Sequence, residues 1–112
     1  MAAGTHNFTL EQGSTFSRQI TVQENSTALN LTGYTARMQM RSTHDSSTIA
    51  LTYTSTIASP ASNGKINLSA TATQTAAIEE GIYVYDLEIE SSGGEVTRLM
   101  EGQVTVTPEV TR

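Results

Sequence analysis

The stretch that decides the fold is Glu79-Glu80-Gly81-Ile82-Tyr83-Val84-Tyr85-Asp86-Leu87-Glu88-Ile89-Glu90. Side chains of an extended chain alternate between two faces. One face of this stretch would hold aromatic and apolar residues: Tyr83, Tyr85, Leu87 and Ile89. The opposite face would carry an acidic row, which consists of Asp86, Glu88 and Glu90. The alternation therefore predicts a strand whose tyrosines turn into a core.

A short helical turn is expected just before this strand. Thr71-Ala72-Thr73-Gln74 has the spacing of a capping box and predicts a turn that runs to about Ile78. Next come Gly81 and an aromatic residue, Tyr83, two positions ahead of a core position. This order is typical of an immunoglobulin-like sandwich where the chain turns into its penultimate strand.

The same alternation recurs along the chain and predicts about seven short strands. They cover residues around 8–10, 15–23, 36–41, 49–53, 66–68, 83–90 and 96–106. Asn63-Gly64 marks a tight turn, and Gly102 indicates a bulge in the last strand. That strand is expected to align Val96, Met100, Val104 and Val106 on one face. Arg18 interrupts an apolar face, so we expect it at a rim with its charge in water.

These patterns predict an all-β fold: an immunoglobulin-like β-sandwich of about seven strands with one short helical turn before the sixth strand. The 112 residues form one domain, residues 1–112, with flexible ends at 1–6 and 110–112. A small closed barrel fits the same pattern and stays an alternative.

Composition excludes several classes of function. The net charge is −5 with six Lys and Arg residues, which argues against a nucleic-acid partner. No segment is apolar and long enough for a membrane helix, and the first residues do not resemble a signal peptide. We therefore expect synthesis in the cytoplasm and no membrane partner. There is no Cys for a disulfide or a Cys-zinc site.

Five stretches, which together span nearly the whole chain, carry a resemblance to a known family. They are Asn7–Phe16, Leu31–Arg41, Gly64–Thr71, Gly81–Ile89 and Val96–Arg112. The series resembles a family of small proteins encoded among the structural genes of tailed bacteriophages and prophages. More distantly, it is similar to the N-terminal immunoglobulin-like domain of the phage baseplate upper protein.

The resemblance implies a non-catalytic virion structural protein with a β-sandwich fold, made in the bacterial host cytoplasm, and it does not settle whether the protein sits on the tail, the baseplate or the head. We expect a tail or baseplate accessory protein. Its partners would be other virion proteins and copies of itself, with no small-molecule substrate. Two alternatives stay open: a capsid decoration (cement) protein, and a host receptor or glycan-binding module. The few aromatic residues make the last of these the weaker alternative.

The chain offers no convincing catalytic, cofactor or metal site, so the prediction for each is none. His6 and His44 would have to meet near a carboxylate such as Asp45 to hold a metal. The acidic row could bind Ca²⁺ or hydrolyse a glycan, but hydrolysis needs an enclosed carboxyl group. We expect instead a solvated sheet face on which Arg37 or Arg41 meets these acids.

One apolar group lacks a place in the predicted core. Ile82, Val84 and Leu99 would lie on the outer face of the sheet if the tyrosines point inward. Such a patch usually marks a contact site, so these three residues are the candidate interface. The alternative is that the N-terminal segment or a loop covers them.

Overall fold

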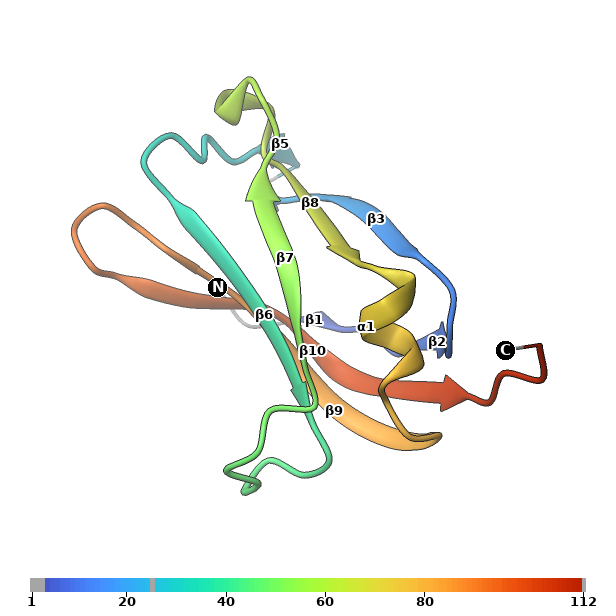
Figure 1. The fold of residues 1–112 in the computed structure, drawn as a ribbon. Coiled ribbons are helices and arrows are strands. Elements are labelled where there is room, and N and C mark those ends of the chain that lie inside the picture. The colour runs from blue at the N-terminus through green and yellow to red at the C-terminus, as the bar shows by residue number, and fades with distance from the viewer. Residues whose placement is uncertain (1–3, 25, 112) are drawn as a thin grey trace.

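The protein is built mainly from strands (Figure 1). The computed structural model describes residues 4–24 and 26–111. Seven strands in this part have four residues or more: β2 (Phe8–Glu11), β3 (Phe16–Thr21), β6 (Thr35–Arg41), β7 (Leu51–Ile57), β8 (Lys65–Ala70), β9 (Gly81–Glu90) and β10 (Val96–Thr107). The shorter elements are β1 (Gly4–Thr5), β4 (Gln23–Glu24), β5 (Thr27–Ala28), the 3₁₀ turn η1 (Ala61–Asn63) and the helix α1 (Ala72–Ala76). The all-β prediction is confirmed.

The strands form a β-sandwich because one long sheet curls through β7. The order is β1-β10-β9-β6-β7-β8-β3, with β2 also paired to β10. The first half of β7, Leu51 to Tyr53, pairs with β6, and the second half, Thr54 to Ile57, pairs with β8. In the described residues β3 pairs with β8 alone, so the path stays open and the closed barrel is not formed.

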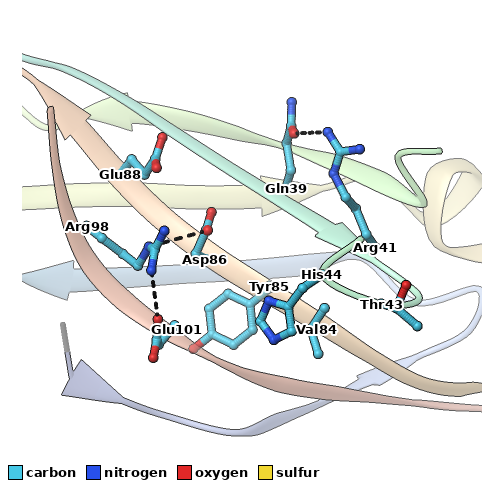
Figure 2. Close-up of a pocket in the computed structure, with 10 residues that line it drawn as sticks. All are labelled: Gln39, Arg41, Thr43, His44, Val84, Tyr85, Asp86, Glu88, Arg98 and Glu101. Carbon is cyan, nitrogen blue, oxygen red and sulfur yellow. Dashed lines mark hydrogen bonds and ion pairs between the residues drawn. The ribbon is translucent and has the colours of Figure 1, made fainter. Parts of the chain in front are cut away.

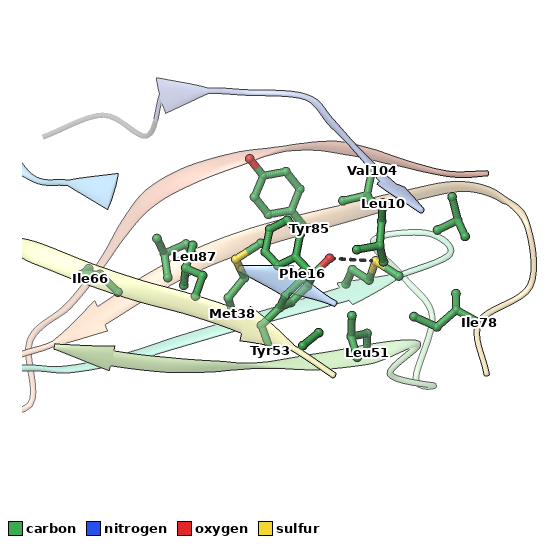
Figure 3. Close-up of a cluster of buried hydrophobic side chains, with 14 of the residues drawn as sticks. Leu10, Phe16, Met38, Leu51, Tyr53, Ile66, Ile78, Tyr85, Leu87 and Val104 are labelled. Carbon is green, nitrogen blue, oxygen red and sulfur yellow. Dashed lines mark hydrogen bonds between the residues drawn. The ribbon is translucent and has the colours of Figure 1, made fainter. Parts of the chain in front are cut away.

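Apolar side chains from both layers fill the space between them (Figure 3). Residues at the centre are almost fully shielded from solvent: Met40, Ile66, Leu87 and Val104. Tyr85 is buried as predicted, and its ring meets Phe8 edge-on at 5.0 Å between centroids. Its hydroxyl donates to the carbonyl of His6, which ties the N-terminal segment to the core.

The predicted helical turn is α1, and it closes one end of the sandwich. The Thr71 hydroxyl accepts from the Gln74 N–H at 3.1 Å, and the Gln74 side chain accepts from the Thr71 N–H at 2.8 Å, which completes the capping box. Thr75 is fully buried, and its hydroxyl donates to the Ser14 carbonyl at 2.8 Å. The half-buried Tyr83 donates to the Glu79 carbonyl at 2.8 Å, as expected at an immunoglobulin-like corner.

Two more contacts complete this end. The Gln12 amide donates to the Ile78 carbonyl at 2.7 Å and accepts from the Glu109 N–H at 3.0 Å. We call the segment Thr71–Tyr83, together with Gln12 and Ser14, the corner. Its hydrogen bonds join segments from the start, the middle and the end of the chain.

Three details of the predicted strands need correction. The bulge of β10 lies between Arg98 and Met100, not at Gly102. Gly102 lies where the N-terminal segment crosses, because an added Cβ would come within 2.3 Å of the His6 carbonyl oxygen. The bulge reverses the alternation, so Val96 pairs with Glu90 and lies exposed instead of sharing the core face with Val104.

Part of the N-terminal segment 1–6, for which we predict flexibility, forms a short strand. Gly4 and Thr5 form β1, which pairs in parallel with Met100 and Glu101 of β10. Within the predicted flexible ends, residues 1–3 and 112 lie outside the described residues. In the described part of the chain, no helix combines the length and the apolar character that a membrane crossing requires.

Candidate interaction surfaces

Two of the three candidate interface residues share the outer face of β9. Ile82 is 63% exposed, and Val84 is half-buried. Ile82 lies opposite Thr105 of β10, while Val84 lies between Arg41 of β6 and Gln103 of β10. The apolar part of this face is therefore a pair of side chains surrounded by polar neighbours.

Leu99 does not join this pair. It is the extra residue of the β10 bulge, where the register shifts between Arg98 and Met100. Because the bulge redirects its side chain, Leu99 packs against the core from the inner side of the sheet. Simple alternation could not reveal this, since a bulge moves every later residue to the other face.

The acidic row meets arginines along the outer face. Arg37 contacts Glu88 at 2.9 Å and Glu90 at 2.8 Å. Arg98 contacts Asp86 at 3.5 Å and Glu101 at 3.2 Å. The prediction that Arg37 meets these acids is confirmed.

Arg41 does not contact the acidic row: its guanidinium donates hydrogen bonds to the Ser46 carbonyl and to the Gln39 side chain. All of these charged groups are partly exposed, so each pair adds little to stability.

Between these residues lies a shallow polar hollow of about 270 Å³ (Figure 2). His44 and Thr43 border it from the loop after β6, and Asp86 and Glu101 border it from β9 and β10. Partial burial, with a smaller contribution from Glu88, raises the pKa of Asp86, and Arg98 opposes the shift. The hollow is thus a solvent-exposed cluster of paired charges, and it lacks the enclosure that a general acid requires.

The two histidines lie in different surroundings. His44 borders the polar hollow, whereas His6 lies on the N-terminal segment and stacks on Phe8 at 6.5 Å between ring centroids. Within residues 4–24 and 26–111, no three His, Asp or Glu side chains are grouped so that they could hold a metal ion.

A second hollow, of about 380 Å³, opens on the inner side of the layer that contains β9 and β10. It lies between β3 and the N-terminal segment. We call it the apolar hollow. Its walls are mainly apolar side chains from both layers: Phe8, Phe16, Ile20, Met38, Leu68 and Leu99. The sandwich is open here because β3 and the β1–β2 segment do not pair with each other.

Arg18 covers this hollow. Its guanidinium carbon lies 5.5 Å from the ring centroids of both Phe8 and Phe16. The side chain is exposed, as its place at a rim predicted, and within the described residues it forms no ion pair. Sequence reasoning noticed Arg18 only as a break in the alternation and missed the hollow, because Leu99 and the β1 segment that border it were misplaced.

Comparisons with known proteins bear on the fold alone. No known family description matches the chain. No curated protein sequence matches it either. Among solved structures, CopC from Methylosinus trichosporium OB3b is similar over 100% of this chain and 90% of that chain, with a TM-score of 0.51 and 12% identity. At that identity the likeness supports the β-sandwich and carries no statement about a ligand.

Proposed function

We propose that this protein is a non-catalytic structural component of a tailed phage particle, acting at the tail or baseplate through protein–protein contacts. The observation that carries the proposal is the open side of the sandwich, where an apolar hollow lies beside an edge of β3 that no other described strand pairs with. Exposed strand edges and apolar grooves bind other chains. The resemblance of the sequence to proteins of tailed phages supports the assignment to a phage particle.

The charged face supports a structural role. Carboxylates that work as acid or base catalysts lie in enclosed sites that shift their pKa. Here Glu88 and Glu90 are held by Arg37, and Asp86 faces Arg98 on an open sheet. These pairs fit a surface that contacts another protein better than they fit a reaction centre.

The location can be tested on particles from the strain that encodes the chain. Gold-labelled antibody against the pure protein should bind at the tail or baseplate, and antibody absorbed with the pure protein serves as control. Label on the head would favour a capsid decoration protein instead. Absence of the chain from purified particles would overturn the proposal, and binding of the pure chain to host cells would favour a receptor-binding module.

A matched pair of variants tests the outer face. Ile82→Asp puts a charge on the exposed apolar pair. Thr54→Asp puts a charge on an exposed position of β7, in the half of that strand that pairs with β8. We expect Ile82→Asp to lower incorporation into particles and Thr54→Asp to leave it unchanged, with both proteins soluble and folded. Equal incorporation of the two variants would exclude this face as a contact.

A further inference from the structure

We propose that copies of this chain join head to tail by strand addition, with the start of β10 from one copy pairing along the free edge of β3 in the next. The inference deepens the proposed function, since it names a second copy as the partner of the open side. It commits to two different surfaces of the chain that meet each other.

The first surface is the free edge of β3. The strand pairs with β8 on one side, and no other strand of the described residues lies on its other side. The Val22 N–H donates to the Gly64 carbonyl at 2.6 Å in the register that continues β3 and β8. Hydrogen-bonded pairs alternate in antiparallel ladders, so the main-chain groups of Ser17, Gln19 and Thr21 point outward.

The second surface is the start of β10. On its outer side, β1 begins to pair only at Met100, so in the described residues Val96 to Leu99 pair with β9 alone. The Ser91 N–H donates to the Glu95 carbonyl at 2.9 Å in the same register as Val96 with Glu90. By the same alternation, the main-chain groups of Val96 and Arg98 point away from β9, and no strand of residues 4–24 and 26–111 pairs with them on that side.

The two edges match in the alternation of their outward main-chain groups and in the charges of Arg18 and Glu95. Among the antiparallel pairings that join these outward groups, two bring Glu95 near Arg18: those that set Val96 opposite Ser17 or Gln19. Glu95 then lies directly opposite Arg18 in the first register and diagonal to it in the second, both within reach of these long side chains. Glu95 is exposed, and Val96 is 46% exposed, so both are available to a second copy.

Arg18 makes the edge selective. A charged side chain that faces inward on an edge strand discourages pairing with strands that bring no counter-charge. A strand that brings Glu95 supplies that charge and covers the apolar hollow at the same time. The contact is heterologous, so repeated copies close into a ring or extend as a filament.

Charge reversal tests the pairing. Sedimentation velocity should show association of the wild type as its concentration rises to about 1 mM. Arg18→Glu and Glu95→Arg should each lower the association constant about tenfold or more, because like charges then meet. The double variant should recover it to within about threefold. Glu80→Arg, an exposed reversal away from both edges, is the matched control, and thermal melting checks that each variant is folded.

Several results would overturn the inference. One is a wild type that stays monomeric over the whole concentration range. Another is a loss of association in Arg18→Glu that Glu95→Arg alone does not cause and that the double variant does not reverse. That second result would indicate a contact between two β3 edges instead. These results are distinct from failure of the proposed function, because antibody label on the tail does not depend on how copies join. Label on the tail with a monomeric chain would refute this inference alone.

Discussion

The corner and the open side close the same core in opposite ways. At the corner, the buried Thr75 hydroxyl and the Gln12 amide bond to main-chain groups from distant segments. At the open side, Arg18 lies over two aromatic rings, and a hollow of about 380 Å³ lies beside the edge of β3 that stays unpaired within the described residues. Polar contacts to the backbone therefore hold the corner in one arrangement, whereas the open side is the surface for which we propose a partner chain.

The largest difference should come from truncating apolar side chains at the two ends. Ile78 is buried at the corner, and Ile20 is half-buried beside the apolar hollow. Ile78→Ala should lower the free energy of unfolding by about 2–5 kcal/mol, because a closed site cannot refill the cavity. Ile20→Ala should cost less than about half of that. Urea unfolding of both variants measures the contrast, and equal losses would contradict it.

The corner hydrogen bond comes next in size. Thr75→Val keeps the shape of the side chain but removes the hydroxyl that donates to Ser14 and, at 3.2 Å, to Ala72. The loss should be about 1–3 kcal/mol, since the Ser14 carbonyl is left without this donor. The control is Thr73→Val on the exposed side of the same helix, which should stay within about 0.5 kcal/mol of wild type.

Alkaline pH should weaken the fold through a tyrosine that holds the N-terminal segment. Burial raises the pKa of Tyr85 to about 12, whereas an unfolded tyrosine ionises near its ordinary pKa of about 10. Stability is therefore fully present below pH about 10 and falls between the two values, by up to about 1.4 kcal/mol per pH unit. Tyr85→Phe should show a shallower fall in urea unfolding between pH about 9 and about 11. An identical slope would refute the assignment.

Arg18 should matter little to stability. Its contacts with Phe8 and Phe16 are exposed, and exposed cation–π pairs contribute about 0.5–1 kcal/mol. Arg18→Met replaces them with apolar contact over the same hollow, so unfolding should stay within about 0.5 kcal/mol of wild type. A loss comparable with that of Thr75→Val, measured in the same urea series, would mean that both ends are equally fixed.

The smallest effect concerns the acidic row, which belongs to neither end. Because the pKa of Asp86 is raised in the fold, its contribution favours folding at acid pH and is lost as pH rises through the folded pKa. Asp86→Asn should therefore melt slightly higher than wild type at neutral pH, with Arg98 still paired to Glu101. The gap should close in acid. A variant that melts lower at neutral pH would show that the Arg98 contact outweighs the burial.

Sequence reasoning reached the fold because its signals were local. The alternation around Tyr85, the capping box at Thr71 and the turn at Asn63-Gly64 each depend on neighbouring residues, and each is present. The errors at Leu99, Val96 and β1 have a different origin. A bulge and a two-residue parallel strand are set by contacts with distant segments, and no pattern within a few residues reports them.

The same limit applied to the candidate surfaces. The outer-face pair Ile82 and Val84 was found because it needed only the alternation of one strand. The apolar hollow combines six strands that are far apart in the sequence. Its position follows only once the curl of the sheet through β7 is known.

The shared strand β7 also has a mechanical consequence. Since its two halves belong to different layers, the layers cannot slide past or peel away from each other while β7 keeps both ladders. A pull that separates the layers must break the hydrogen bonds of one half of β7, either those of Leu51–Tyr53 with β6 or those of Thr54–Ile57 with β8. A force applied to one layer is therefore passed to the other through β7.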